Sequence, residues 1–427
     1  MSSPCLVLGI DLGTSGVRIA VINQKKQLIQ TVASDYPRGL AWTEDWRSCC
    51  IELINSLPSG VRSQLRAIAV DGTSGTLVAC KTNGEPLTEA LLYNHAYPEH
   101  SLRIKQLVSS DSSASSVSSS LARALQLTSE LGDDLLLRHQ ADWVTGWLMN
   151  NWSFGEEGNN LKLGWDLSQG DWPKSFNSMP WKGALPKIIA SGKIMGNIAH
   201  QQAKALGVPL DLVVVAGSTD ANAAFLAADA GPNEGVTVLG STVVLKRFVD
   251  KPIKGKGITN HRVEERWLCG GSSNAGGAVL RKLFSDSELK ELSRQINPEE
   301  NSGLFLRPLP GIGERFPVDD PTMTPIMAPR PISDALYLHG ILEGLARIEA
   351  AGWQRLCELG APPAKGIITL GGGARNPQWR KIRERIIGLP IRSSSAPPAS
   401  GVARIALRAL QNIMIRKNEA GESNPLT

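Results

Sequence analysis

A short segment near the start of the chain combines a carboxylate, two glycines and two hydroxyls in one tight turn. The segment Asp11-Leu12-Gly13-Thr14-Ser15-Gly16 lies between two apolar runs, residues 6–10 and 17–22. Glycines let backbone N–H groups close around a phosphate, and the hydroxyls of Thr14 and Ser15 add donors. Asp11 would lie at the same place, where a carboxylate can hold hydrated Mg²⁺. The turn therefore predicts a phosphate site with Mg²⁺, although a β-hairpin whose turn binds nothing explains this segment alone equally well.

Glycine-containing turns follow apolar runs at three further places. Apolar runs at residues 65–70, 236–239 and 367–370 end in Asp71-Gly72-Thr73-Ser74, Gly240-Ser241-Thr242 and Gly371-Gly372-Gly373, respectively. Residues at the carboxyl end of a strand are where open α/β sheets bind ligands. Because such turns occur in both halves of the chain, we expect the two halves to hold one triphosphate from two sides.

These turns need strands and helices to position them, and the length of the chain indicates two separate frameworks. A chain of 427 residues is too long for one compact core and predicts two α/β domains of about 200 residues each. We place the lobes at residues 1–228 and 229–415, followed by a polar tail at 416–427. The clearest helix spans residues 333–359, where apolar residues recur on one face. We also expect a strand at 27–33, a helix at 49–57 and a helical stretch at 121–152 interrupted near residue 132.

Two segments are open to more than one interpretation. The segment LAWTEDW at 40–46 carries two tryptophans, which favour either core packing or a loop that contacts a sugar. The serine-rich segment at 109–120 lacks apolar periodicity, so we expect either a mobile surface loop or the fraying start of a helix, and we assign it no function.

Composition limits the class of protein. The chain is 42% hydrophobic and 20% charged, with a formal charge of +5, which is ordinary for a globular protein. The basic clusters at 251–256 and 380–385 are short and lack aromatics, so we expect no nucleic-acid partner. No run of 18 apolar residues is present and the first strand begins almost at Met1, so we expect a cytoplasmic protein without a membrane segment or signal peptide. The six cysteines form no CxxC pair, which predicts neither disulfides nor zinc.

Common nucleotide-binding signatures are missing from the sequence. No GxxxxGK[ST] segment is present, which excludes a P-loop, and no GxGxxG follows the first strand, which counts against a dinucleotide-binding fold.

The ordered set of motifs resembles the FGGY family of carbohydrate kinases. The resemblance covers about residues 6–390 and rests on DLGTSGVR, DGTSGT, NLKLGWD, GSTDAN, LGSTVVLK, GGSSNAGG and ITLGGGARNPQWRKI. It implies a two-lobed actin-like ATPase fold of the ribonuclease H-like type. Each lobe would be a mixed five-stranded sheet flanked by helices, with ATP·Mg²⁺ between the lobes. The compact length, DGTSGT and NLKLGWD look most like the short xylulose-kinase-like proteins of cyanobacteria and plants, which are regarded as D-ribulose kinases.

The resemblance implies a nucleotide site built from both lobes. Asp11 would help to hold Mg²⁺, and Gly13, Thr14 and Ser15 would contact the transferring phosphate. From the second lobe, Ser241 and Thr242 would grip the phosphates. Residues without a bulky side chain, or with a short amide, would line the nucleoside pocket: Gly271, Gly371, Gly372 and Asn376. Trp379 is either a wall for the adenine or ordinary helix packing.

Asp220 is the predicted catalytic base. Phosphoryl transfer needs little covalent help, and a carboxylate that accepts the proton of the sugar hydroxyl mainly orients the nucleophile. The alternative role of Asp220 is to cap the helix that follows it, and one residue can do both. Together with Asp11 and Asp220, three residues are expected to contact the sugar: Asp71, Ser74 and Asn222.

We therefore predict an ATP-dependent kinase that phosphorylates the terminal hydroxyl of a free ketopentose, with D-ribulose ahead of D-xylulose. The alternatives are another ketose or polyol substrate, or a non-catalytic nucleotide-binding module of the same fold. The expected partners are ATP and a small sugar, and the expected state is a monomer or homodimer. Two departures from the family pattern are His95, where an aspartate is usual, and the segment 393–407, which lacks the usual glutamate-containing turn.

Overall fold

The computed structural model describes residues 5–419 and divides them into two compact units. The first unit contains the residues up to Ala227, the short segment Arg262–Glu265 and the C-terminal part of the chain from Pro397. The second unit contains Ala228–His261 and Arg266–Ala396. The linear division at 228/229 and 415/416 that the sequence suggests therefore needs correction at the C-terminus, because the last helix packs in the first unit. Of the predicted tail at 416–427, residues 416–419 continue this helix and residues 420–427 lie outside the described residues.

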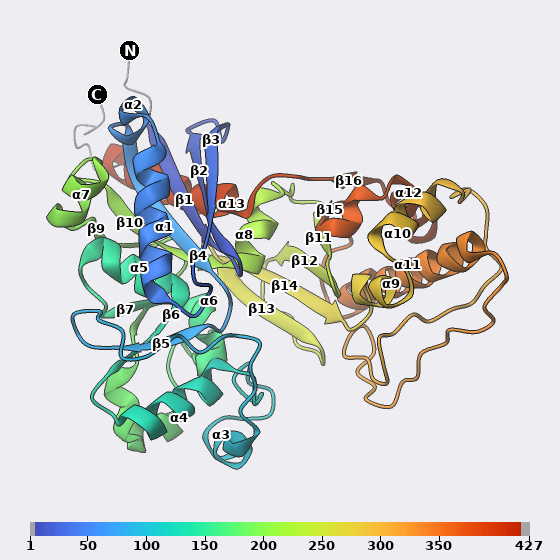
Figure 1. Cartoon of the computed structure of the whole chain (residues 1–427), viewed down its shortest axis with the longest axis horizontal. Coiled ribbons are helices and arrows are strands. Elements are labelled where there is room, and N and C mark those ends of the chain that lie inside the picture. The colour runs from blue at the N-terminus through green and yellow to red at the C-terminus, as the bar shows by residue number, and fades with distance from the viewer. Residues whose placement is uncertain (1–4, 420–427) are drawn as a thin grey trace. The chain divides into compact units, whose positions relative to one another are not determined.

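The first unit is built on a six-stranded mixed sheet in the order β3-β2-β1-β4-β10-β9 (Figure 1). Strands β1, β4 and β10 are parallel, whereas β2, β3 and β9 are antiparallel to their neighbours. The strands are β1 (Leu6–Leu12), β2 (Gly16–Asn23), β3 (Leu28–Asp35), β4 (Leu65–Gly72), β9 (Ile194–Asn197) and β10 (Val213–Thr219).

Successive side chains of a strand point to opposite faces of the sheet, and both faces of this sheet are covered by helices. In β1, Leu6, Leu8, Ile10 and Leu12 share one buried cluster with residues of α1 (Thr43–Ser56) and α5 (Gln140–Met149). The opposite face receives α13 (Pro398–Glu419), which packs on β1, β4, β2 and β10 and on α8 (Asp220–Ala227). A side chain at Gly9 would lie 2.0 Å from the Ala399 carbonyl oxygen, so only glycine permits this close contact between helix and strand.

The connection between β4 and β10 contains most of the remaining elements of the first unit. It includes a two-stranded sheet of β5 and β6 and another of β7 and β8. Its elements are β5 (Leu77–Cys80), β6 (Leu136–His139), β7 (Phe154–Glu156), β8 (Lys187–Ile189), α3 (Ser101–Leu107), α4 (Ser120–Leu131), α6 (Glu157–Asn160) and the 3-10 helices η1 (Pro98–His100), η2 (Leu161–Leu163), η3 (Lys174–Ser178) and η4 (Pro180–Ala184); the unit also has α2 (Ser59–Arg62) and α7 (His200–Leu206).

The second unit repeats the sheet architecture of the first. Its order is β13-β14-β12-β11-β15-β16, with β11, β15 and β16 parallel and β12 antiparallel to both of its neighbours. The elements are β11 (Glu234–Leu239), β12 (Val243–Val249), β13 (Ile258–Val263), β14 (Arg266–Ser273), β15 (Gly366–Leu370), β16 (Ile391–Ser393), α9 (Gly277–Leu283), α10 (Asp286–Arg294), α11 (Asp334–Glu358), α12 (Pro377–Ile387) and the 3-10 helix η5 (Gly372–Arg375).

Each sheet has six strands rather than the five that the resemblance implied, and β9 and β13 lie at the edges of the first and second sheet, respectively. The predicted helix at 333–359 is α11, and the predicted helix at 49–57 belongs to α1, which begins earlier. The helical stretch predicted at 121–152 with an interruption near residue 132 corresponds to α4 and α5, and the interruption contains the unpredicted strand β6. Pairing with β5 makes β6 a strand, because four residues are too few for their periodicity to distinguish a strand from a helix.

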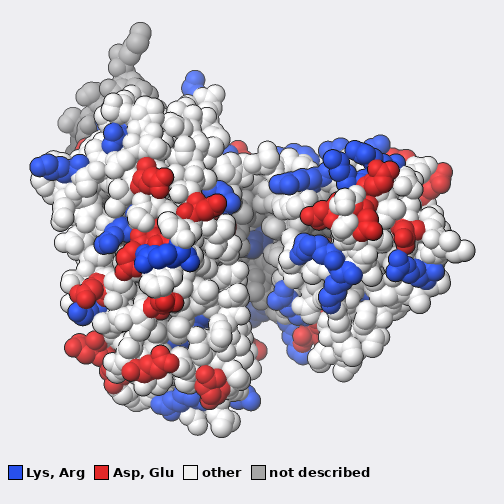
Figure 2. Space-filling view, in the orientation of Figure 1, with Lys and Arg blue, Asp and Glu red and all other residues white. Residues whose placement is uncertain are grey.

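No helix within residues 5–419 combines the length and the apolar character needed to cross a membrane. On the face shown in Figure 2, acidic and basic side chains are intermixed over the first unit, without a continuous basic stripe.

Candidate functional site

Three aspartates of the first unit lie at the carboxyl ends of neighbouring strands. Asp11 near the end of β1 pairs in register with Asp71 near the end of β4, and Ser218 of β10 pairs with Asp71 on its other side. Asp220 follows directly as the first residue of α8. Because β1, β4 and β10 are parallel, their carboxyl ends meet at one edge of the sheet. The structure therefore brings together the predicted metal ligand, a predicted sugar ligand and the predicted base.

The three carboxyl groups influence one another electrostatically. Burial raises the pKa of Asp11, and the negative charge of Asp220 adds to this effect, whereas Asp71 and Arg18 lower it. Burial also raises the pKa of Asp71 well above its usual range, and the charges of Asp11 and Asp220 act in the same direction. Asp71 is completely buried, and among the described residues no N–H group or hydroxyl donates a hydrogen bond to its oxygens. Asp71 is therefore a fully buried carboxyl group beside Asp11, and its pKa is raised.

The positions of Asp71 and Asn222 correct the prediction that both contact the sugar directly. Asn222 is buried, and its side-chain amide donates to the Ser218 hydroxyl at 3.1 Å. Neither side chain presents an atom to solvent in this structure, so both support the site from beneath. Asp220 differs because it is partly exposed, and its Oδ1 accepts a hydrogen bond from the Ala221 N–H at 2.7 Å.

The first predicted phosphate turn connects β1 to β2. It is closed by a hydrogen bond from the Gly13 N–H to the Gly16 carbonyl at 2.9 Å, and Thr14 and Ser15 at its tip are exposed. Arg18 lies beside the turn, with its guanidinium 3.8 Å from the Oδ2 atom of the Asp11 carboxylate. A half-exposed cation next to exposed hydroxyls and backbone N–H groups suits an anionic ligand. Arg18 belongs to the quoted motif DLGTSGVR, but its position beside the turn depends on the hairpin register.

The second turn, residues 73–76, is held by side chains distant in the sequence. Gln140 at the start of α5 accepts hydrogen bonds from the Thr73 N–H at 3.0 Å and the Thr73 hydroxyl at 2.7 Å. Lys162 of η2 donates to the Ser74 carbonyl at 3.1 Å. Ser74 itself is partly exposed, as expected for a sugar ligand. Sequence reasoning does not single out Gln140, because a lone glutamine at a helix start carries no motif.

Two further predictions for the first unit are resolved by packing. Trp46 is completely buried, donates to the Leu40 carbonyl at 2.9 Å and packs edge-on against Trp143, so this tryptophan of the segment at 40–46 serves the core. His95 is exposed, and its ring packs on Tyr97 with a centroid separation of 5.0 Å.

In the second unit, the predicted phosphate turn connects β11 to β12. Ser241 is exposed, and its hydroxyl accepts a hydrogen bond from the Arg281 guanidinium of α9 at 2.7 Å, while Thr242 is partly buried. The turn is braced from behind, since the Gly277 N–H donates to the Gly240 carbonyl at 2.9 Å. Like the turn in the first unit, it therefore combines an exposed hydroxyl with a nearby arginine.

The predicted nucleoside-pocket glycines fall into two groups. A side chain at Gly372 would meet no atom within 4 Å, and Gly372 is exposed, so this position borders open space. Gly371 is exposed too, but its φ of +86° and the Leu239 carbonyl oxygen, 2.6 Å from an added Cβ, require glycine for backbone reasons. Gly271 corrects the prediction, because it is buried and an added Cβ would lie 2.5 Å from the Phe316 ring. Core packing accounts for this glycine.

Asn376 and Trp379 are also occupied within the fold. The Asn376 side chain accepts a hydrogen bond from the Trp379 N–H at 3.0 Å, capping α12, and donates to the Ser293 hydroxyl at 2.8 Å. Trp379 is 2% exposed and belongs to the core of the second unit. Helix packing is therefore the correct interpretation of Trp379.

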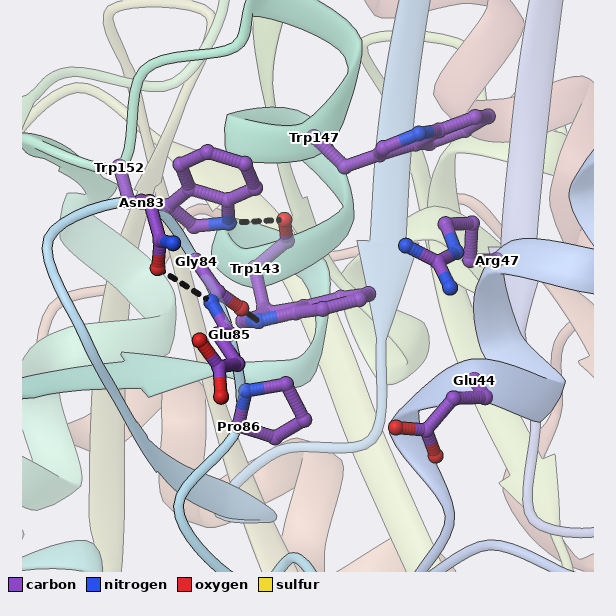
Figure 3. A pocket seen from close by; sticks show the side chains of 9 residues that line it. All are labelled: Glu44, Arg47, Asn83, Gly84, Glu85, Pro86, Trp143, Trp147 and Trp152. Carbon is purple, nitrogen blue, oxygen red and sulfur yellow. Dashed lines mark hydrogen bonds between the residues drawn. The ribbon is translucent and has the colours of Figure 1, made fainter.

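A separate cavity of about 350 Å³ lies in the first unit among α1, α5 and the residues around Gly84 (Figure 3). Three indole rings line it, those of Trp143, Trp147 and Trp152, together with charged groups at Glu44 and Arg47. Two of the rings are fixed by hydrogen bonds, from Trp143 to the Gly84 carbonyl and from Trp152 to the Trp143 carbonyl. None of the predicted ATP or sugar ligands lines this cavity.

The carboxylates suit a metal ion whose other ligands are water and substrate phosphates. Within residues 5–419, no group of three or more His, Cys, Asp or Glu side chains is spaced to hold a metal ion. Mg²⁺ usually keeps several waters and is bound through one or two carboxylates plus substrate phosphates. Asp11, flanked by Arg18 and the exposed turn, suits that arrangement.

Comparison with known proteins agrees with this architecture. Residues 235–410 match the FGGY family of carbohydrate kinases, C-terminal domain. The chain is 22% identical to a xylulose kinase of Escherichia coli strain K12, over 94% of this chain and 89% of that protein. It is also 22% identical to an L-fuculokinase of the same strain, over 91% of this chain and 88% of that protein.

Among solved structures, a ligand-bound xylulose kinase from Lactobacillus acidophilus is similar with a TM-score of 0.80 at 16% identity. The match covers 95% of this chain and 90% of that one. The expected two-lobed actin-like fold is confirmed.

Proposed function

We propose that this chain, which matches the C-terminal domain of the FGGY carbohydrate kinases and has their fold, is an ATP-dependent sugar kinase. Its reaction is transfer of the terminal phosphate of ATP to the terminal hydroxyl of a free ketopentose. D-ribulose is the first candidate acceptor, and D-xylulose or another ketose or polyol is the alternative.

The proposal depends above all on Asp220, which is partly exposed beside two buried carboxyl groups at the strand ends of the first unit. Phosphoryl transfer depends on positioning and electrostatics, and a carboxylate that accepts the acceptor's proton orients the attacking oxygen. Asp11 and Asp71 are buried, so Asp220 is the one of the three that an incoming hydroxyl can reach. We therefore assign it the role of base.

The remaining roles follow from the two exposed turns. In the first unit, Gly13, Thr14 and Ser15 would contact the transferring phosphate, and Asp11 would hold Mg²⁺ through water. When bound, ATP·Mg²⁺ supplies the phosphoryl group, and the ion offsets charge on the phosphate oxygens. In the second unit, Ser241 and Thr242, with Arg281 beside them, would contact phosphates. Gly371 and Gly372 would border the nucleoside.

Fewer observations support D-ribulose as the acceptor than support sugar kinase activity. Relatives named as xylulose kinase and L-fuculokinase match nearly the whole chain, so they do not separate one sugar from another. DGTSGT and NLKLGWD favour ribulose by resemblance to the short kinases. A few side chains in a sugar site can decide between such acceptors.

The test is release of ADP by the purified full-length chain with ATP, Mg²⁺ and a panel of ketoses and polyols. We expect the highest kcat/KM with D-ribulose. For Asp220→Asn we expect the sugar-dependent release of ADP to fall by about 10²-fold or more, which is the scale of a general-base contribution. A higher kcat/KM for another ketose would overturn the ribulose assignment alone. Nucleotide binding without ADP release for any acceptor would overturn the kinase proposal and favour a non-catalytic nucleotide-binding module.

A further inference from the structure

Lys162 is a cation of the first unit to which the roles above assign no chemistry. It lies in η2, and its ammonium reaches the turn at 73–76, where it donates to the Ser74 carbonyl at 3.1 Å. Its stem packs beside Gly75, since an added Cβ there would lie 3.7 Å from the Cδ atom of Lys162. Lys162 and Ser74 are distant in sequence, so only the tertiary fold brings this cation to the predicted sugar turn.

The segment that carries Lys162 is held in place by the residues before it. The side-chain amide of Asn160 donates to the Oδ2 atom of Asp142 at 2.9 Å and to the Glu156 carbonyl at 2.8 Å. The carboxylate of Glu156 in turn caps α6 by accepting two backbone N–H hydrogen bonds, both at 2.8 Å. Leu161, next to the lysine, is buried. The ammonium of Lys162 is therefore presented from a rigid support.

The charges around Lys162 set the character of the site. Burial lowers the pKa of Lys162, the negative charge of Asp220 raises it, and the positive charge of Arg123 lowers it. The Arg123 guanidinium already donates to three carbonyls at 2.7–2.9 Å, those of Leu92, Ser118 and His95. An ammonium has three donors and no acceptor, and among the described residues Lys162 uses one donor, toward Ser74.

We propose that Lys162 is a specificity-determining residue that donates a hydrogen bond to the carbonyl oxygen of an open-chain ketose. A carbonyl oxygen only accepts, so it matches a donor-only ammonium, whereas a hydroxyl both donates and accepts and so matches either kind of group. Asp220 has the opposite character, because a carboxylate only accepts and so matches a hydroxyl. The two groups together suit a molecule that has both a carbonyl and hydroxyls. This inference rests on the proposed function and narrows its substrate class to ketoses over alditols.

The test compares the ketopentose that the full-length chain phosphorylates best with the pentitol obtained by reducing its carbonyl, for example D-ribulose with ribitol. In Lys162→Met, which keeps the packing stem, we expect kcat/KM for the ketose to fall about 10- to 100-fold, the range of a lost hydrogen bond to a charged group. The value for the pentitol should fall much less, and KM for ATP should not change. Lys81→Met is the matched control, because Lys81 pairs with Glu85 at an exposed site of the same unit.

A thermal unfolding curve for each variant separates loss of the ammonium from loss of the fold. An equal fall for ketose and pentitol in folded Lys162→Met, or no fall for either, would overturn the inference and leave Lys162 only the role of bracing the turn. If the wild-type chain phosphorylates no sugar, the proposed function fails instead, so the two failures are distinguishable.

Discussion

At the scale of single residues, the two aspartates nearest the predicted chemistry differ in exposure. Asp11 is buried beside Asp71 and 3.8 Å from Arg18, whereas Asp220 is partly exposed at the start of α8. Exposure suits a carboxylate that meets an incoming hydroxyl, and the exposed turn beside Asp11 suits the phosphate ligands of an ion. Substituting each aspartate should therefore produce a different defect.

Asp220→Asn keeps the size of the side chain but cannot accept the sugar proton. We expect kcat to fall by roughly 10²-fold or more, as for other general bases, with ATP·Mg²⁺ binding nearly unchanged. Asp11→Asn should weaken the metal-dependent step, so raised Mg²⁺ should restore part of its activity. Steady-state kinetics over a Mg²⁺ series measures both effects. Activity of Asp220→Asn within a few-fold of wild type would leave Asp220 only the role of helix cap, which asparagine also fills.

Gly372 tests the nucleoside side of the site. An added side chain there meets no protein atom within 4 Å, so Gly372→Val should leave the fold intact and act only on a ligand. We expect a raised KM for ATP and little change in KM for the sugar. Gly311→Val is the control, because Gly311 is also exposed with no atom within 4 Å. An unchanged KM for ATP in Gly372→Val would place the nucleoside elsewhere.

At the scale of elements, a buried ion pair ties the helices of the second unit to its sheet. Arg383 of α12 contacts both carboxylate oxygens of Glu349 of α11 at 2.6 and 2.7 Å, and both side chains are 1% exposed. Thr237 of β11 and Thr369 of β15 complete the network, at 2.6 and 2.7 Å. This network orients α12, whose N-terminus follows the turn with Gly371 and Gly372.

Removing one partner should be more harmful than removing both. Arg383→Met leaves a buried carboxylate without its cation, which costs about 3–5 kcal/mol in the free energy of unfolding. The double substitution Arg383→Met with Glu349→Leu should recover part of that loss, since no unpaired charge remains. Arg355→Met, which removes an exposed pair with Glu358, should cost under about 1 kcal/mol. Urea denaturation measures the free energy of unfolding of all three variants. Equal losses of this free energy for Arg383→Met and Arg355→Met would show that the buried network stabilises the unit no more than the exposed pair does.

At the scale of the whole molecule, the C-terminal helix completes the first unit. Helix α13 packs on β1, β2, β4 and β10, and its buried residues include Val402, Ile405 and Leu407. Close approach depends on small residues on both sides: an added Cβ at Gly401 would lie 1.9 Å from the Ala223 carbonyl oxygen of α8. The first unit is therefore discontinuous in sequence.

A chain ending at residue 396 should lose the first unit. Leaving Val402, Ile405, Leu407 and Leu410 out of the core forfeits about 6–12 kcal/mol, which is similar to the whole stability of a domain. We expect residues of the first unit to become susceptible to limited proteolysis, while a chain ending at residue 419 remains resistant. Mass spectrometry of the fragments identifies the cleaved unit, and resistance of the shorter chain would mean that α13 is dispensable.

The sequence by itself determined the local features of this protein. Glycine and hydroxyl residues after apolar runs predicted the turns at 13–16, 73–76 and 240–242, because backbone constraints on a tight turn act within a few residues. The same holds for α11, whose apolar face repeats at helical spacing. The ordered motifs also indicated the family resemblance that the match over residues 235–410 supports.

Only the tertiary structure decided which residues share the site and which serve the core. Gly271 is required by the Phe316 ring, and the side chains of Trp379 and Asp71 are buried. Lys162 reaches Ser74 across 88 residues of chain. Such contacts depend on how strands pair and helices pack over long sequence separations, and no local pattern encodes them.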